Sequence, residues 1–174
     1  MSDYMIRDVR EDDSAELSRI YSYYVMNTAV SFEYEAPSEQ EFGERIKKIT
    51  AKYPYLVCEK DGRIAGYVYA GEYSSREAYS WTVAASIYVK NELRRHGIGT
   101  MLYAELEKRL MDMGIVNLLA GTAYCENEDE YLTHGSYDFH AARGFHQVAR
   151  LETVGKKFGR WYDLVWMQKK IGEG

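Results

Sequence analysis

This sequence of 174 residues has little cysteine and little proline, and it has no long apolar run. Two cysteines, Cys58 and Cys125, are too few for a disulfide framework, so we expect reduced thiols, which is typical of cytoplasmic proteins. No stretch approaches the roughly 20 apolar residues of a membrane-spanning helix, and charges alternate from Asp3 to Asp13. These absences argue against membrane anchoring and secretion, and they predict a cytoplasmic location.

An excess of basic residues is also missing. Lysine and arginine number 22 against 27 aspartates and glutamates, which leaves a formal net charge of −5. Proteins that track a phosphate backbone usually carry a basic face, so this balance favours a small-molecule partner over nucleic acid. No linker, repeat or low-complexity tract divides the chain, so we expect one domain over residues 1–174.

The spacing of apolar residues predicts alternating helices and strands of the α/β (α+β) class. Two capping boxes, Asp13 with Glu16 and Ser38 with Glu41, predict helix starts, and a third helix is expected over 98–113. Asp61-Gly62 between two apolar runs predicts a β-hairpin of 55–59 with 64–70. The remaining expected elements are strands at 5–9, 79–89, 116–122, 145–151 and 161–167 and a short helix at 136–143. The sequence thus predicts a mixed sheet of about seven strands flanked by about four helices.

A strand, a basic glycine turn and a helix follow one another between Ser86 and Leu102. Gly97 and Gly99 let main-chain N–H groups approach a ligand, and the N-terminus of the following helix favours an anion such as a pyrophosphate. A Gly-x-Gly turn alone is weak evidence, because a structural turn before a surface helix has the same sequence. Neither the Lys-Ser/Thr ending of a nucleotidase P-loop nor the third glycine of a dinucleotide fold follows.

This turn resembles the Arg/Gln-x-x-Gly-x-Gly/Ala signature of the GNAT acyl-CoA-dependent N-acetyltransferases, with Arg94, Gly97 and Gly99 in the signature positions. The order of the expected elements is similar to the GNAT fold as well. The resemblance implies acetyl-CoA as co-substrate, a turn that holds its pyrophosphate, and a preceding strand that splays from its neighbour around Ser86 and Ile87 and bonds the pantetheine arm. The cofactor-binding residues so implied are Ile87, Tyr88, Val89, Arg94, Arg95, His96, Gly97, Ile98, Gly99 and Thr100.

Further segments resemble one branch of this family, the phosphinothricin and methionine sulfone/sulfoximine acetyltransferases. They are 31–33, 76–83, 86–89 and 155–163, and the Gly-x-Lys-x-Gly-x-Trp-x-Asp run in the last is the most specific. On composition alone, that run would pass for a basic hairpin loop with a core tryptophan. The resemblance implies direct transfer of acetyl to the amine of a small amino-acid-like acceptor, without a covalent enzyme intermediate, and a homodimer.

The same branch implies residues for the acceptor and for further cofactor contacts. Arg76 and Lys157 match positions near the acceptor pocket, where a guanidinium can bind a carboxylate through two hydrogen bonds, and an exposed loop charge is the alternative for Arg76. Phe32 and Tyr79 are expected to wall that pocket, although such aromatic residues are more often part of the core. Alignment of the short helix adds Thr133 and Ser136 to the cofactor site.

The groups for proton transfer depart from the family pattern. Thr-Val-Glu in the family is Thr82-Val83-Ala84 here, so the expected glutamate is missing. Three explanations stay open: Glu33 acts through a water, the acceptor is a less basic amine, or turnover is poor. His140 occupies the position of a family histidine and is expected to protonate the leaving thiolate or to bond the coenzyme. A solvated loop charge and a satisfied core histidine are the structural alternatives for these two residues.

An acidic insertion follows Cys125 and contains Glu126, Glu128, Asp129 and Glu130. Its spacing is not that of a calcium loop, so we expect a solvated loop and no metal. Two other functions stay open at this stage. One is a coenzyme-binding sensor that lost turnover with the glutamate. The other is a protein N-terminal acetyltransferase, which needs an open peptide groove and is disfavoured by the 157–163 motif.

Overall fold

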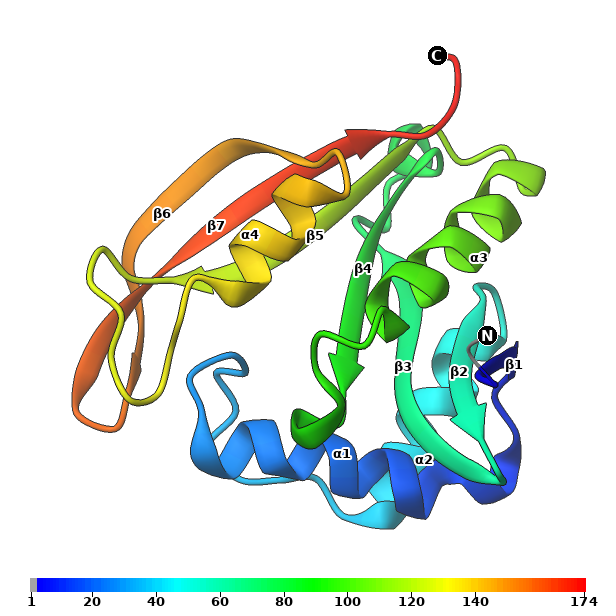
Figure 1. Cartoon of the computed structure of the whole chain (residues 1–174). Helices are drawn as coiled ribbons and strands as arrows, with labels where there is room; N and C mark the ends of the chain where they lie inside the picture. The colour runs from blue at the N-terminus through cyan, green and yellow to red at the C-terminus, as the bar shows by residue number, and fades with distance from the viewer. Residues whose placement is uncertain (1–2) are drawn as a thin grey trace.

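Seven strands form one sheet in the order β1-β2-β3-β4-β5-β7-β6 in the computed structural model, which describes residues 3–174 (Figure 1). Only β4 and β5 run parallel; every other neighbouring pair within the described residues is antiparallel. The strands are β1 (Met5–Asp8), β2 (Tyr55–Lys60), β3 (Arg63–Glu72), β4 (Thr82–Val89), β5 (Asn117–Tyr124), β6 (His146–Lys157) and β7 (Arg160–Lys170). The α-helices are α1 (Ser14–Asn27), α2 (Glu39–Thr50), α3 (Ile98–Asp112) and α4 (Gly135–Ala142). The predicted mixed α/β sheet with four helices is confirmed.

Each face of the sheet is covered by a different pair of helices (Figure 1). Alternate residues of a strand point to opposite faces, and β4 follows this rule. Its residues Val83 and Ala85 are buried in the core cluster of α3, and Ile87 packs against that cluster, with α4 nearby through Phe139. Tyr88 instead packs against the cluster that α1 and α2 form with β2 and β3. The molecule therefore has an α3/α4 face and an α1/α2 face.

The parallel pair β4 and β5 separates after three residues. Pairing runs from Thr82 opposite Asn117 to Ala84 opposite Leu119, and the strands then diverge (Figure 1). Beyond that point β4 continues to pair with β3 up to Val89, while its other edge has no strand partner among the described residues. The predicted splay around Ser86 and Ile87 is confirmed, and it leaves main-chain groups of β4 available to a ligand.

One expected helix cap is wrong. Asp13 and Glu16 do not form a capping box, because each carboxylate bonds a partner outside α1. Asp13 accepts hydrogen bonds from the Arg7 guanidinium and from the main-chain N–H of Arg10, at 2.8 and 2.6 Å. Glu16 accepts one from the main-chain N–H of Ile64 at 3.0 Å. These bonds tie the start of α1 to β1 and β3, which a local pattern does not reveal.

The other local signals are mostly confirmed. Ser38 and Glu41 form the expected capping box, and Asp61 and Gly62 adopt the positive φ angles, 51° and 73°, of a tight hairpin turn. The strand expected from Tyr79 starts later, at Thr82, because Glu77–Tyr79 forms a turn of 3-10 helix. None of the helices formed by residues 3–174 has the length and apolar character needed to span a bilayer.

Candidate active site

The N-terminus of α3 has the features of an anion site. Gly97 precedes the helix in the left-handed conformation with φ of 80°, and its missing Cβ would meet no neighbouring atom within 4 Å. The first turn contains no acidic residue and receives no side-chain cap within the described residues. The N–H groups of Ile98, Gly99 and Thr100 are therefore free, as the first N–H groups of an uncapped helix are, and the helix dipole adds positive potential.

The residues before Gly97 hold the turn in shape. Arg95 has a positive φ of 67°, and the Nδ1 atom of His96 lies 3.1 Å from the main-chain oxygens of both Leu93 and Arg94. Nδ1 must carry the proton to donate to either oxygen. His96 thus fixes the turn through its side chain, while the expected contribution of its main chain to a ligand stays a prediction.

The N-terminus of α4 lies beside this turn. A guanidinium nitrogen of Arg94 is 3.0 Å from the position that a Cβ of Gly135 would occupy. Thr133 accepts a hydrogen bond from the Gly135 N–H at 3.2 Å, and Ser136 follows in the first turn of α4. The structure therefore brings together the two segments that the family resemblance assigns to the cofactor.

Gly99 has a packing role that the sequence does not reveal. A Cβ at this position would lie 2.8 Å from the ring of Phe139 on α4, so glycine permits close contact between the two helices. Arg143, just after α4, donates a hydrogen bond to the Thr100 hydroxyl, and its guanidinium lies 5.7 Å from the Phe139 ring centre. Arg143 was not among the expected cofactor residues, and it adds a second cation to Arg94 near the free N–H groups.

The gap between β4 and β5 carries one further unpaired polar group. Thr122 on β5 is 3% exposed, and its hydroxyl has no hydrogen-bond partner within residues 3–174. By alternation, Thr122 points to the same face as Leu118 and Ala120, which are buried in the α3 core cluster. Buried hydroxyls are normally bonded, so the Thr122 hydroxyl is an exception on the α3/α4 face. Thr122 had no sequence signal of its own.

His140 is 3% exposed and both of its ring nitrogens are bonded. Nδ1 lies 2.7 Å from the main-chain oxygen of Ser136, and Nε2 lies 2.7 Å from the Tyr103 hydroxyl. Since the carbonyl can only accept, Nδ1 carries the proton and Tyr103 donates to Nε2. Burial lowers the pKa of His140 and favours its neutral form. These contacts match the satisfied core histidine, and proton donation to a thiolate stays a prediction.

Glu33 is held by two neighbours. Arg45 on α2 donates to both carboxylate oxygens, at 2.6 and 3.0 Å, and Tyr21 on α1 donates a third hydrogen bond. The hydrogen bonds from Arg45 lower the pKa of Glu33. The carboxylate is thus ionised near neutral pH, and it is not the free loop charge of the structural alternative. Its expected part in catalysis stays a prediction.

The 155–163 motif forms the turn of the β6–β7 hairpin and contacts the end of α1 and the loop that follows it. Lys157 is 3% exposed and donates to the main-chain oxygens of Val25 and Ser31, both at 2.7 Å. Burial lowers the pKa of Lys157. The ring of Phe32 lies 2.6 Å from where a Cβ of Gly155 would be. Lys157 and Phe32 therefore make structural contacts here, and their expected contacts with an acceptor stay predictions.

Two other expected acceptor residues are exposed. Arg76 precedes the 3-10 turn between β3 and β4, and Tyr79 ends that turn with 42% of its surface exposed. The Tyr79 ring packs edge-on against Tyr73, at 5.4 Å between centres. Among the described residues, no hydrogen bond or ion pair joins Arg76 or Tyr79 to Glu33 or Lys157. The expected contacts of Arg76 and Tyr79 with an acceptor therefore stay predictions.

The acidic loop after Cys125 is bonded to the protein. Asp129 accepts hydrogen bonds from two loop N–H groups and from the Tyr162 hydroxyl, between 2.8 and 2.9 Å. Glu126 pairs with Arg150 at 3.1 Å, and Glu130 pairs with Arg160 at 2.9 Å. Glu126 and Glu130 are exposed, as expected of a solvated loop, and their ion pairs also connect the loop to β6 and β7.

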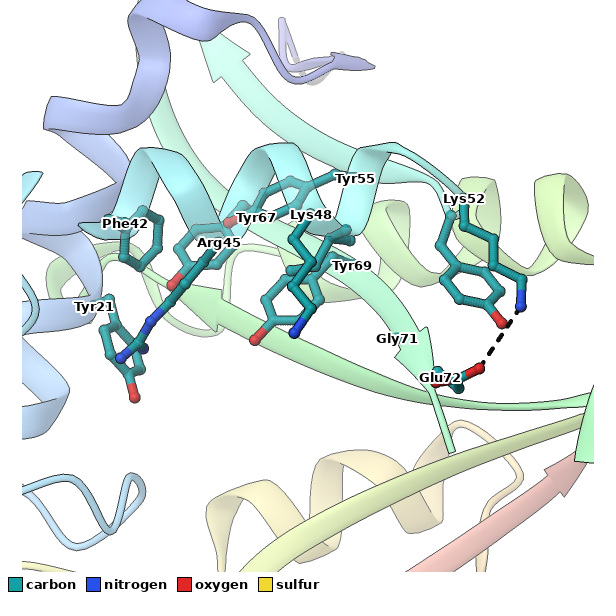
Figure 2. Close-up of a pocket in the computed structure, with 12 residues that line it drawn as sticks. Tyr21, Phe42, Arg45, Lys48, Lys52, Tyr55, Tyr67, Tyr69, Gly71 and Glu72 are labelled. Carbon is teal, nitrogen blue, oxygen red and sulfur yellow. Dashed lines mark ion pairs between the residues drawn. The ribbon is translucent and has the colours of Figure 1, made fainter. Parts of the chain in front are cut away.

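A cavity of about 400 Å³ lies on the α1/α2 face, between α2 and strands β2 and β3 (Figure 2). Tyrosines of both strands line it, and so does Gly71, which pairs with Ala84 of β4. By alternation with Val83 and Ala85, the side chain of Ala84 points to this α1/α2 face. The position of the missing glutamate thus faces this side of the sheet, where β4 and β5 part.

Comparisons with known proteins agree with these features. A family model described as an acetyltransferase (GNAT) domain matches residues 6–166. A phosphinothricin N-acetyltransferase of Alcaligenes faecalis is 36% identical over 97% of this chain and 83% of its own length. An L-methionine sulfoximine/L-methionine sulfone acetyltransferase of Salmonella typhimurium is 29% identical over 97% of this chain and 95% of its own length. A crystal structure of a GNAT superfamily phosphinothricin acetyltransferase from Sinorhizobium meliloti, in complex with AcCoA, superimposes with a TM-score of 0.90 at 33% identity, over 99% of this chain and 91% of that one.

Proposed function

Since this chain belongs to the GNAT acetyltransferase family and is an acetyl-CoA-dependent N-acetyltransferase, we propose that its acceptor is the α-amine of a free amino acid or a close analogue. Phosphinothricin and methionine sulfone, named for its relatives, are analogues of this kind. One observation carries the proposal. The anion site of α3 and the tyrosine-lined cavity lie on opposite faces of the sheet, and the parting of β4 and β5 connects the two faces.

The α3/α4 face is proposed to hold the cofactor, which supplies the activated acetyl thioester when bound. The free N–H groups of Ile98, Gly99 and Thr100 suit a pyrophosphate, and Arg94 and Arg143 add positive charge beside them. The unpaired edge of β4 at 87–89 suits the amide groups of a pantetheine arm. Support for these roles comes from the free N–H groups at the start of α3 and from the edge of β4 that has no strand partner among the described residues.

Proton transfer is proposed to involve Glu33. The reaction forms a C–N bond and breaks a C–S bond, so a proton must leave the amine nitrogen and the departing thiolate must gain one. Because Arg45 keeps Glu33 ionised, the carboxylate can orient an ammonium group, and it can accept its proton through a water. Its lowered pKa makes Glu33 a weak base, which fits a slower enzyme than one with the strand glutamate.

The assembly is part of the proposal. The resemblance implies a homodimer, and the edge strand β6 exposes Val148, Leu151 and Val154, each close to half of its surface. An exposed apolar edge strand favours pairing with a second chain. Measurement of the molar mass in solution tests this part independently of activity.

The test of function is release of free coenzyme A thiol from acetyl-CoA over a panel of amino acids and their sulfone, sulfoximine and phosphinate analogues. The natural chain should acetylate at least one of them, and Ala84→Glu should raise kcat/KM by about 100-fold if only the base is missing. Glu33→Gln should lower the rate of the natural chain. Binding of coenzyme A without thiol release from any amine in the panel would contradict the proposed acceptor class.

A further inference from the structure

Two arginines beside the start of α3 have no acidic partner. Arg94 is exposed and Arg143 is half-buried, and neither forms an ion pair with a carboxylate of residues 3–174. The chain has 27 acidic residues against 22 lysines and arginines, so a shortage of carboxylates does not explain the two unpaired cations. A guanidinium binds a phosphate through two hydrogen bonds, and an unpaired guanidinium therefore suits such an anion.

The two guanidiniums lie at different places along α4. A nitrogen of Arg94 is 3.0 Å from where a Cβ of Gly135, the first residue of α4, would be. Arg143 follows the last residue of the helix, and its guanidinium donates a hydrogen bond to the Thr100 hydroxyl of α3. At about 1.5 Å per residue, positions 135 and 143 are about 12 Å apart along α4. The two arginines therefore belong to opposite ends of α4.

Phe139 lies between these two ends. It is four residues after Gly135 and four before Arg143, so the three positions share one side of the helix. Its ring lies beside Gly99, 2.8 Å from where a Cβ would be, and the Arg143 guanidinium lies 5.7 Å from the ring centre. The ring thus fills the contact between α3 and α4 at this point. A pyrophosphate, as one compact group, fits beside one of the two cations, and the other cation suits a second phosphate.

We propose that Arg143 binds the 3′-phosphate of coenzyme A and gives the protein a preference for coenzyme A over ligands without this phosphate. The inference rests on the proposed cofactor face and goes beyond it by separating the two cations, since it leaves the pyrophosphate to Arg94 and the N–H groups of α3. Coenzyme A carries both phosphate groups on its ADP moiety. One N–H of Arg143 is used by Thr100, and the remaining donors of the guanidinium stay available for a bidentate contact. Thr100 is exposed, so a ligand can reach this place.

The test is isothermal titration of the full chain with coenzyme A and with 3′-dephospho-coenzyme A, which keeps the pyrophosphate. The natural chain should bind coenzyme A about tenfold more tightly. Arg143→Gln should weaken the binding of coenzyme A alone, so that the two affinities become equal within about twofold. Because both ligands are measured on the same protein, a partial loss of folding affects both and cannot imitate a change in their ratio.

Three further variants sharpen the test. Arg94→Gln should weaken both ligands by a similar factor, about fivefold, and leave their ratio unchanged. Arg143→Lys keeps the charge but loses the planar fork, so a preference of about threefold should remain. Lys108→Gln is the matched control, because it removes one positive charge from an exposed position further along α3, and it should change neither affinity.

Three outcomes would overturn the inference. Equal binding of the two ligands by the natural chain would mean that the 3′-phosphate makes no contact. An equal loss for both ligands in Arg143→Gln would place Arg143 at the pyrophosphate, and an unchanged ratio in that variant would assign the 3′-phosphate to another residue. The proposed function fails separately. A preference for coenzyme A that is lost in Arg143→Gln, with no amine acetylated, would contradict the proposed acceptor class and support the inference.

Discussion

Two glycine-containing segments, 94–100 and 155–163, carry most of the resemblance to the family, yet their polar groups are used in opposite ways. At the first segment the N–H groups before Met101 are free and the residues are mostly exposed. At the second, the Lys157 ammonium is buried and bonded to two main-chain oxygens. The comparison teaches that two motifs of one family resemblance can differ in whether their polar groups have partners in the protein.

The largest effect should come from Lys157→Met. Methionine fills the buried space but leaves the main-chain oxygens of Val25 and Ser31 unbonded, so we expect a loss of about 3 kcal/mol in the free energy of unfolding. Urea denaturation measures it. Lys156→Met is the matched control, because Lys156 is exposed and only lies over the Trp161 ring, and it should change stability by less than about 0.5 kcal/mol.

The opposite result for Lys157 would contradict the difference drawn between the two segments. An unchanged stability of Lys157→Met together with a raised KM for the acceptor would show that the ammonium binds substrate, as the resemblance implies. The second segment would then resemble the first, with a polar group used for a ligand.

A somewhat smaller effect is expected from Thr100→Glu. A carboxylate in the first turn of α3 lies where the pyrophosphate is expected, so coenzyme A affinity should fall by about 30-fold, which is about 2 kcal/mol. The same charge favours the helix dipole and should raise stability by about 0.5 kcal/mol. Isothermal titration with coenzyme A measures the loss of affinity, and urea denaturation measures the gain in stability. Thr100→Gln is the neutral control, and an equal loss of affinity there would contradict an electrostatic site.

The two segments also differ in how far the sequence could predict them. The turn at 94–100 depends on glycine, on a helix start and on main-chain N–H groups, all of which are local features of the sequence. The sequence therefore predicts N–H groups that are available to a ligand. The partners of Lys157 lie 132 and 126 residues away in sequence. No local pattern identifies such partners, so the family resemblance was the only guide, and it pointed to the acceptor.

The fold shows the same difference between features with local partners and features with partners far away in the sequence. The Ser38 capping box and the Asp61-Gly62 hairpin were predicted because their partners are neighbours in sequence. The cap expected at Asp13 failed because Arg7 of β1 binds that carboxylate. The cavity under α2 has no sequence signal, since its lining residues come from α1, α2 and two strands.

His140 offers a further test, because both of its ring nitrogens are bonded within the protein, as the Lys157 ammonium is. Its pKa is lowered in the folded protein, so over the pH range between that value and the unfolded value near 6.5, only the unfolded chain binds the proton. Stability should therefore fall as the pH falls through 6.5, by up to about 1.4 kcal/mol per pH unit. His140→Gln should reduce this slope, whereas His146→Gln, at an exposed position, should not. Identical slopes in all three proteins would mean that His140 titrates normally.

The smallest and most closely matched test uses Gly97 and Gly159. Both have positive φ, 80° and 73°, and a Cβ at either position would meet no neighbouring atom within 4 Å. Alanine therefore adds only backbone strain, and Gly97→Ala and Gly159→Ala should each lose about 1 kcal/mol of stability. Coenzyme A affinity should fall in Gly97→Ala alone, because its methyl group enters the space where a phosphate approaches free N–H groups. Equal coenzyme A binding by the two variants would mean that Gly97 is needed only for the turn conformation. Gly97 would then have no part in the proposed pyrophosphate site.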